Sequence, residues 1–364
     1  MINVIHFTSC IRRGGIERQV SEIIYNSTTI NHIWVSLYYS KDNYLINSDN
    51  ILYTIHSPKI IKRIKEFNKV VKSFNPGVVV CWDVATYIIA LLSKGIRSNQ
   101  IINASIQHGI FKKTKSGYLR MFVAHLSKYV MANSQAGLRV NKLKKGILLY
   151  NGVNEIFNKE IYIKEDHSTS KRYHPILVSI MNMTPYKDYF TIFKALELLK
   201  QEGINFTYYI IGDGPLRANY ESYLSKSIIK CNVVLLGNIN SPEEYLVQSD
   251  IFIHSSKGEG VSNAILEAMY MGLPIITTDT GGTLEILEDN AITFSYQDYQ
   301  ALYEGLNILI NDEKLRKRMG EKSHSIVKEK FTTERMVRNY ERIINAVINN
   351  NMESISDLIY IQKG

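Results

Sequence analysis

Cysteine is scarce in this sequence of 364 residues: Cys10, Cys81 and Cys231 lie far apart in the chain. An odd, scattered set does not fit a disulfide framework or a cysteine-ligated metal site, so we expect reduced thiols in a cytosolic protein. Long hydrophobic runs are missing too. The longest candidate, residues 77–92, contains Asp83 and falls short of the roughly 20 apolar residues that a membrane-spanning helix needs. The chain also begins without the basic start of a signal peptide, and no membrane crossing is predicted.

Two glycine motifs resemble a dinucleotide-binding fingerprint but do not match it. Gly14-Gly15 follows the first predicted strand, but the sequence around it is not G-x-G-x-x-G. These two glycines either let the backbone approach a ligand closely or form a tight turn and nothing more. Gly212-Asp213-Gly214 follows a later strand, where Pro215 and the lack of a third glycine spoil the pattern. We interpret this second motif as structural packing.

Strand and helix patterns alternate along most of the chain. The composition, 45% hydrophobic and 21% charged, is that of a globular protein, and the length suggests two domains. The alternation predicts an α/β fold with doubly wound parallel sheets. The predicted strands cover residues 2–8, 77–82, 101–109, 130–134, 147–150, 176–180, 206–211, 233–237 and 251–254, and the main predicted helices cover 57–74, 189–200, 299–310, 313–330 and 333–349.

Charge is distributed unevenly. Residues 1–150 hold 21 lysines and arginines against 6 acidic residues, a net charge of +15, whereas the remainder holds 22 against 28, a net charge of −6. The overall charge of +9 therefore hides two electrostatically different halves.

The stretch 254–285 combines several features of a ligand site. An apolar strand runs through a glycine loop into a predicted helix, whose first amides, around Gly260, Val261 and Ser262, form an anion site. Glu259 and Glu267 are separated by seven residues, and Glu267 has apolar neighbours, so its charge needs hydroxyl or amide partners. A ligand with a phosphate and several hydroxyls would satisfy these groups. An ordinary strand–loop–helix unit with solvated or capping glutamates is the alternative.

The order of motifs in this stretch resembles the donor site of retaining GT-B glycosyltransferases of family four. That family shows E-x7-E, then G-x-P and a strand, then Gly-Gly and Glu. The matching residues are Glu259, Glu267, Gly272-Leu273-Pro274, Gly281-Gly282 and Glu285. The resemblance implies two facing Rossmann-like domains with a cleft between them. It places an acceptor-binding domain at residues 1–153, a linker region at 154–174, a donor-binding domain at 175–335 and a C-terminal helix at about 336–364 that packs back on the first domain.

The resemblance also assigns roles to residues outside this stretch. Gly14 and Gly15 match a loop that faces the donor phosphates or the acceptor, and His108 matches a histidine beside the donor sugar. Lys187 matches a lysine that binds the donor diphosphate, while Asn182 stands where most members have an arginine. The expected catalytic residues are His108, Glu259 and Lys187, and the expected donor-binding residues are Gly14, Gly15, Asn182, Lys187, Glu259, Gly260, Val261, Ser262 and Glu267.

The function implied by the resemblance is transfer of a sugar from a UDP- or GDP-linked donor, with retention of configuration, to a saccharide acceptor that we expect to be lipid-linked. Capsule, O-antigen or other lipopolysaccharide synthesis is the implied setting. The sequence contains no Asp-x-Asp, so we expect no metal and no cofactor besides the nucleotide sugar. A nucleotide-sugar epimerase or phosphorylase on the same fold, or a non-catalytic partner subunit, are the alternatives.

The basic residues of the first half predict a membrane surface as partner. Lys112, Lys113, Lys115 and Arg120 lie in an amphipathic stretch, residues 111–129, and no nucleic-acid-binding module is recognisable. We therefore expect these four residues to face an anionic membrane or a lipid-linked acceptor, and nucleic acid to be excluded as a partner. The expected location is cytoplasmic, peripheral on the inner face of the cytoplasmic membrane.

Overall fold

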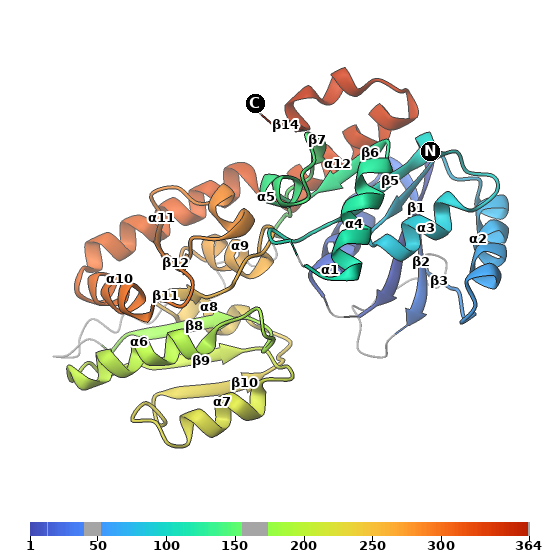
Figure 1. Cartoon of the computed structure of the whole chain (residues 1–364). Coiled ribbons are helices and arrows are strands. Elements are labelled where there is room, and N and C mark those ends of the chain that lie inside the picture. The colour runs from blue at the N-terminus through green and yellow to red at the C-terminus, as the bar shows by residue number, and fades with distance from the viewer. Residues whose placement is uncertain (13, 40–51, 112, 155–173, 363–364) are drawn as a thin grey trace. The chain divides into compact units, whose positions relative to one another are not determined.

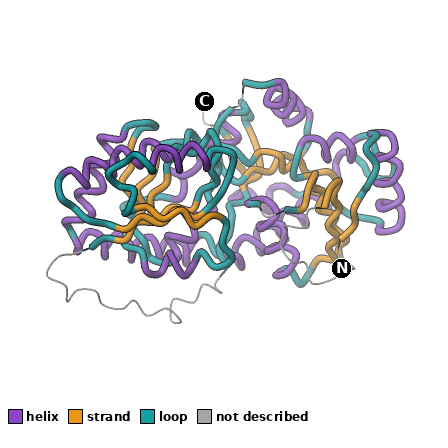
Figure 2. Tube along the Cα trace, turned by 90° about the horizontal axis from the view of Figure 1, so that it is seen from below, coloured by secondary structure: helices purple, strands orange, loops and turns teal. Residues whose placement is uncertain are grey.

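The computed structural model describes residues 1–12, 14–39, 52–111, 113–154 and 174–362 (Figure 1). They form two compact units: unit 1 comprises Met1–Gly152 and Thr333–Gly364, and unit 2 comprises Val153–Thr332. In each unit the strands make a layer with helices on both sides (Figure 2). The predicted α/β class with two parallel sheets is therefore confirmed. Most of the predicted linker region, 154–174, lies outside the described residues.

Unit 1 is built on an eight-stranded sheet in the order β14-β7-β6-β5-β4-β1-β2-β3. Its strands pair in parallel except for β14, which runs antiparallel to β7. The order reverses between β1 and β4, so the loops that follow these two strands meet at the carboxyl edge of the sheet. The strands are β1 (Ile2–Ile11), β2 (Ile30–Tyr39), β3 (Leu52–Thr54), β4 (Val78–Cys81), β5 (Ile101–Ile106), β6 (Tyr129–Ala132), β7 (Lys145–Leu148) and β14 (Ile359–Ile361).

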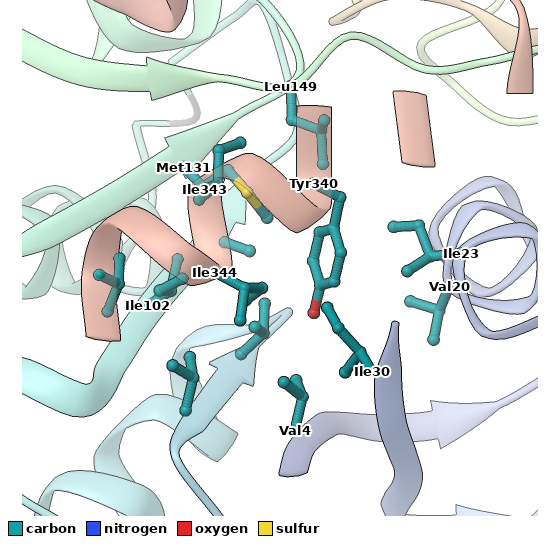
Figure 3. Packing of buried hydrophobic residues seen from close by; sticks show 14 of the residues in the cluster. Val4, Val20, Ile23, Ile30, Ile102, Met131, Leu149, Tyr340, Ile343 and Ile344 are labelled. Atoms are coloured by element: carbon teal, nitrogen blue, oxygen red, sulfur yellow. The ribbon is translucent and has the colours of Figure 1, made fainter. Parts of the chain in front are cut away.

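Helices cover both faces of this sheet. The helices of unit 1 are α1 (Gly15–Asn26), α2 (Ile60–Phe74), α3 (Val84–Leu91), α4 (Lys115–Leu126), α5 (Gln135–Val140) and α12 (Thr333–Ile348), with 3₁₀ helices η1 (Ser98–Gln100) and η5 (Met352–Leu358). Tyr340 and Ile344 of α12 point toward Val4 and Ile30 of the sheet, opposite Val20 of α1 (Figure 3). Because α12 fills this core, the last segment of the chain is part of unit 1.

Unit 2 is built on a six-stranded parallel sheet in the order β10-β9-β8-β11-β12-β13. Here the order reverses between β8 and β11. The strands are β8 (Ile176–Ile180), β9 (Thr207–Ile211), β10 (Val233–Gly237), β11 (Ile251–His254), β12 (Ile275–Thr278) and β13 (Ala291–Phe294). Ligands of open α/β sheets bind outside the carboxyl ends of the strands at such a reversal, so the loops after β8 and β11 are the first place to look for a site.

The helices of unit 2 bury apolar stripes against this sheet. They are α6 (Tyr189–Gln201), α7 (Arg217–Leu224), α8 (Glu243–Gln248), α9 (Asn263–Tyr270), α10 (Tyr299–Asn311) and α11 (Glu313–Lys330), with the 3₁₀ helix η4 (Gly281–Ile286). α6 packs against α10, and α9 packs against α11. Phe193, Tyr208 and Leu306 are among the fully buried residues of the resulting core. No helix in the described part of the chain is long and apolar enough to span a bilayer.

The helix α12 covers Thr333–Ile348, close to the helix predicted from the sequence at 333–349. The family resemblance implied a helix over about 336–364, and this longer helix is not present in the described residues. Asn349, Asn350 and Asn351 follow, and Asn350 adopts a left-handed conformation with φ of 50°. Asparagine tolerates this conformation and competes for backbone hydrogen bonds, so it ends a helix readily. The remaining residues form η5 and the edge strand β14.

Candidate functional site

Two loops of unit 2 run side by side at the point where the strand order reverses. One follows β8 and carries Lys187, and the other follows β11. The backbone N–H of Asp188 donates to the carbonyl of Ser255 at 3.1 Å, and that of Lys257 donates to the carbonyl of Tyr186 at 2.9 Å. These two bonds fix the register of the loops, and they bring the side chain of Lys187 to the loop after β11.

Lys187 and Glu259 form an ion pair between these loops. The Lys187 side chain is 10% exposed and that of Glu259 is 27% exposed, so the pair is partly shielded from water. His254, the last residue of β11, completes a triangle: its Nε2 lies 2.9 Å from Lys187 Nζ and 3.0 Å from Glu259 Oε2. An ammonium, a carboxylate and an imidazole thus meet at the carboxyl edge of the sheet.

The charges in this triangle follow from burial and from each other. Burial raises the pKa of Glu259, but Lys187 and His254 lower it by more, so the pKa lies well below the usual range of a glutamate. Burial lowers the pKa of His254, the charge of Lys187 lowers it again, and Glu259 only partly compensates. At pH 7 the carboxylate is therefore ionised and the imidazole is neutral.

The Gly281-Gly282 pair holds the backbone of Glu259. The N–H of Gly282 donates to the Glu259 carbonyl at 2.7 Å. Gly281 has φ of 68°, and a Cβ at this position would overlap the same carbonyl. The two glycines let the loop before η4 pack directly on the Glu259 backbone, which is a structural reason for the Gly-Gly motif in the sequence.

The helix after the glycine loop begins slightly later than predicted. α9 starts at Asn263, with Ser262 at its N-cap position. Its first-turn amides are therefore those of Asn263 and the residues that follow, whereas Gly260 and Val261 belong to the loop. Glu267 is buried in the middle of α9 with 4% of its surface exposed. A nearly buried carboxylate on a helix requires polar partners, and Glu267 does interact with other groups of the protein.

The other predicted site residues lie at comparable strand ends. Asn182 is exposed in the loop after β8. In unit 1, Gly14 and Gly15 lie where β1 leads into α1, and His108 is exposed just beyond the end of β5. Lys187, Glu259 and His254 are in contact within unit 2. The roles predicted for Asn182, Gly14, Gly15 and His108 stay predictions.

The predicted membrane-facing segment coincides with α4 and the residues before it. Lys113 and Lys115 are exposed, Arg120 is only partly exposed and burial lowers its pKa, and Lys112 lies outside the described residues. The helix shows an exposed apolar stripe that charge counting did not reveal. Its members are Tyr118 at 53%, Leu119 at 46%, Phe122 at 62% and Leu126 at 66% exposure.

His254 and its neighbour Thr277 were not identified from the sequence. The hydroxyl oxygen of Thr277, on β12, lies 3.4 Å from His254 Nδ1. A histidine that ends an apolar strand directly before the glycine loop was the available signal. It carries no information by itself, because buried strand-end histidines are common in cores. Within the described residues, no group of three or more His, Cys, Asp or Glu side chains is arranged to hold a metal ion.

Comparison with protein families identifies the part of the chain that contains this site. Residues 163–325 match the family model described as glycosyl transferases group 1. The chain is 27% identical over 208 residues to N-acetyl-alpha-D-glucosaminyl L-malate synthase of Bacillus anthracis, covering 55% of this chain and 53% of that protein. It is 26% identical over 212 residues to the O-antigen biosynthesis glycosyltransferase WclY of Escherichia coli, covering 56% of each. The chain thus spans about half the length of these curated relatives.

Comparison with solved structures extends over nearly the whole chain. Anabaena Alr3699/HepE, solved in complex with UDP and glucose, superposes with a TM-score of 0.76 at 16% sequence identity. The match covers 95% of this chain and 100% of that one. At this level of identity the similarity establishes the fold alone, which is the GT-B fold with two Rossmann-like units.

Proposed function

Because residues 163–325 match the family model described as glycosyl transferases group 1, we propose that this chain transfers a sugar from a nucleotide-diphosphate sugar to a saccharide acceptor. The observation that carries this proposal is the contact between Lys187, Glu259 and His254 at the strand-order reversal of unit 2. An ammonium suits a diphosphate, and a carboxylate suits the hydroxyls of a sugar. Both groups stand at the edge of the sheet where α/β proteins bind their ligands.

Each residue of the donor site has a specific role in this proposal. Lys187 binds the diphosphate and stabilises the negative charge that develops as the nucleotide leaves. Glu259 accepts hydrogen bonds from hydroxyls of the transferred sugar, and the buried Glu267 accepts them from the ribose. Gly260, Val261, Ser262 and the first turn of α9 supply amides to the phosphates. Since Lys187 provides positive charge beside the diphosphate, we propose that the reaction proceeds without a divalent metal.

Retention of configuration and a role in surface polysaccharide synthesis complete the proposal. Retention is supported by the E-x7-E arrangement of Glu259 and Glu267, which is the arrangement of the retaining enzymes that the sequence resembles. Polysaccharide synthesis is supported by the relative named for O-antigen biosynthesis. Asn182, Gly14, Gly15 and His108 are assigned to the donor, with His108 acting on the sugar rather than on the nucleotide.

A panel of UDP- and GDP-linked sugars tests the activity. The chain should release the nucleotide diphosphate slowly from one donor without an acceptor, faster with a saccharide acceptor, and equally well in EDTA. Product NMR should show the anomeric configuration of the donor. An epimerase would change the sugar while it stays attached to the nucleotide, a phosphorylase would require inorganic phosphate, and a non-catalytic subunit would release nothing from any donor.

We also propose that unit 1 binds an anionic membrane, peripherally and on the cytoplasmic side, to reach a lipid-linked acceptor. Tyr118, Phe122 and Leu126 recur every four residues and therefore share one face of α4, where their apolar side chains are exposed. Exposed Lys115 is the first residue of the same helix, and exposed Lys113 lies two residues before it. An apolar helix face beside lysines is typical of helices that lie in the membrane interface.

Cosedimentation with vesicles of anionic and of zwitterionic phospholipid tests this membrane binding. The wild type should bind anionic vesicles more strongly at low salt, and a Phe122→Ser/Leu126→Ser variant should bind much less at any salt. The Lys112/Lys113/Lys115 triple alanine variant should lose the salt-dependent part. Ile308→Ser, which replaces a residue of α10 that is 51% exposed, is the matched control and should bind normally. Equal binding by the α4 variants would favour a soluble acceptor.

A further inference from the structure

His254 is almost fully enclosed and yet both of its ring nitrogens have polar neighbours. The residue is 1% exposed. Its Nδ1 lies 3.4 Å from the hydroxyl of Thr277, and its Nε2 lies 2.9 Å from Lys187 Nζ and 3.0 Å from Glu259 Oε2. These neighbours come from three different segments: the loop after β8, the loop after β11, and β12. A single side chain therefore touches both charged groups of the proposed donor site.

Hydrogen-bond chemistry decides which nitrogen carries the proton. A neutral imidazole has one N–H donor and one acceptor nitrogen, and an ammonium can only donate. If Lys187 donates to Nε2, the ring proton is on Nδ1, where it is donated to Thr277. In this tautomer Nε2 has no proton for Glu259 Oε2. Although that oxygen is only 3.0 Å away, it is buried without a hydrogen-bond partner in the described part of the chain.

Oε2 of Glu259 is a candidate acceptor for a hydrogen bond from a ligand. Lys187 already donates to Oε1 of the same carboxylate, and Oε2 is enclosed by protein, so a ligand hydroxyl can use Oε2 only after the Glu259 side chain moves. A buried carboxylate oxygen without a donor is unfavourable, and a hydroxyl that fills this position gains a charge-assisted hydrogen bond. Because His254 is neutral at pH 7, owing to its burial and to the charge of Lys187 that lower its pKa, the ring donates no proton to this oxygen.

We propose that His254 is a positioning residue of the donor site: it accepts a hydrogen bond from Lys187, holds the ammonium for the diphosphate, and leaves Glu259 Oε2 for a hydroxyl of the sugar. The proposal rests on the proposed function, because it assigns His254 a part in binding the same nucleotide sugar. It differs from a packing role in that the imidazole acts through its acceptor nitrogen and through Lys187.

Replacement by leucine and by glutamine separates these two roles. Leucine fills a similar volume but accepts no hydrogen bond, whereas glutamine carries an amide oxygen near the position of Nε2. We expect His254→Leu to weaken UDP binding about tenfold, as for the loss of a hydrogen bond to a charged group, and His254→Gln to remain within about threefold of wild type. Calorimetric titration with UDP, repeated with GDP, measures both, and melting temperatures show that the variants are folded.

A double-mutant cycle shows whether His254 acts through Lys187. In a Lys187→Ala background, His254→Leu should weaken UDP binding no further, because the ammonium that the imidazole holds is already gone. His324→Leu is the matched control. This part-buried histidine donates a hydrogen bond from Nδ1 to the Tyr270 carbonyl, away from Lys187 and Glu259, and its replacement should leave UDP affinity unchanged.

The pH dependence of UDP binding gives a second readout. Protonation of His254 places an N–H where Lys187 needs an acceptor, and it adds a positive charge that faces Lys187, Glu259 and Thr277. Wild-type affinity should therefore fall more steeply than that of His254→Gln as the pH drops through the lowered pKa of His254, which lies below the ordinary histidine value of about 6.5. Protonation of UDP itself affects both proteins equally and cancels in the comparison.

The outcomes are distinct. Unchanged UDP affinity and an unchanged pH profile in a folded His254→Leu variant would overturn the positioning role, and so would a glutamine variant as weak as the leucine one. An additive loss in the Lys187→Ala background would show that the imidazole only supports the fold. If the wild type binds neither UDP nor GDP, the proposed function fails first, and the role of His254 fails with it.

Discussion

Lys187 and Glu259 neutralise each other in the absence of a donor, and this has a consequence for binding. The carboxylate of Glu259 pairs with the Lys187 ammonium, which is the group that a diphosphate would bind. A nucleotide diphosphate without a sugar must break or weaken this ion pair, while the sugar of a complete donor restores hydrogen bonds to Glu259. The pair therefore favours the complete donor over the nucleotide product.

Glu259→Gln should separate these two effects. We expect UDP to bind about fivefold more tightly, equivalent to about 1 kcal/mol, because Lys187 is released from a charged partner. Transfer from the nucleotide sugar should become slower, because a neutral amide is a weaker acceptor for the sugar hydroxyls. Calorimetry with UDP and steady-state kinetics measure the two effects.

Glu288→Gln is the control for this variant, since Glu288 forms surface ion pairs with Lys322 and Lys330 in the same unit. It should alter neither quantity. Weaker UDP binding by Glu259→Gln would mean that Glu259 supports the position of Lys187 rather than competing for its charge.

We predict that a second pair of residues, His6 and His32 in unit 1, makes stability depend on pH. The indole N–H of Trp82 donates to His6 Nδ1 at 3.3 Å, so the proton of neutral His6 is on Nε2 and is donated to His32 Nδ1 at 3.0 Å. Burial, and then the charge of His32, lower the pKa of His6; burial lowers the pKa of His32 to about 4 against the opposing charge of Glu341. Both rings are therefore neutral in the folded protein at pH 7.

The sign of the effect follows from proton binding. Both pKa values are lower in the folded chain than the value of about 6.5 expected when unfolded, so the unfolded chain binds more protons as the pH falls. The contribution of these two histidines to the free energy of unfolding should be complete above pH 6.5. Below that pH the free energy of unfolding should decrease, by up to about 1.4 kcal/mol per pH unit for each histidine. Urea denaturation between pH 7 and pH 5 measures this slope. His32→Gln should reduce it, and a slope equal to that of wild type would rule out the pair as its source.

At the level of elements, the sequence predicted the framework of unit 2 well. The expected strands 176–180, 233–237 and 251–254 and the helix 313–330 coincide with β8, β10, β11 and α11. These segments have clear apolar patterns with glycine or polar residues at their ends. Lys187 and Glu259 lie in loops between these elements and are more than seventy residues apart in the sequence. Their contact could be seen only in the folded structure.

β2 shows why other elements were missed. Polar residues such as Asn31, His32 and Ser36 interrupt its apolar pattern. In the folded chain His32 bonds to His6, and the hydroxyl of Ser36 lies 3.4 Å from that of Thr54 on β3. Polar groups with partners like these can be buried, but their partners are distant in sequence. The same reasoning applies to His254, whose significance depends on Lys187 and Glu259.

The contact between the η4 segment and the donor loop predicts an unequal effect of two glycine substitutions. Gly281 and Gly203 both have positive φ, of 68° and 77°. Alanine at either position should cost about 1–2 kcal/mol of stability from backbone strain. Only at Gly281 would the new Cβ also overlap the carbonyl of Glu259, since nothing lies near that position at Gly203.

We therefore expect Gly281→Ala to lower the melting temperature more than Gly203→Ala and to weaken UDP binding, whereas Gly203→Ala leaves UDP affinity unchanged. Thermal unfolding and UDP titration measure the two effects. Equal UDP affinity in both variants would mean that the Gly-Gly motif does not set the position of Glu259 for UDP binding.

At the scale of the whole molecule, the chain passes through unit 2 and ends in unit 1. Residues 333–364 belong to unit 1, and α12 contributes Tyr340, Ile343 and Ile344 to its core. The return of the C-terminal segment was expected from the family resemblance, whereas its division into α12, η5 and β14 was not. The basic half of the sequence, residues 1–150, coincides closely with the first segment of unit 1.

This arrangement predicts that unit 1 depends on a helix at the far end of the chain. Ile344 of α12 is fully buried, and Ile344→Ala should lower the free energy of unfolding by about 2–5 kcal/mol through lost burial and a cavity. Ile348→Ala on the same helix, where the side chain is 40% exposed, should change it much less. Urea denaturation of the full chain compares the two, and equal effects would argue against α12 as part of the core.

The central claim is that the second unit binds the diphosphate of a nucleotide sugar through Lys187. Calorimetric titration of the full chain and of its Lys187→Ala variant with UDP and with GDP tests it most directly. We predict that one of the two nucleotides binds the wild type at a single site, and that the variant binds it at least about tenfold more weakly. Equal affinity of the variant, or no binding of either nucleotide to the wild type, would contradict the account.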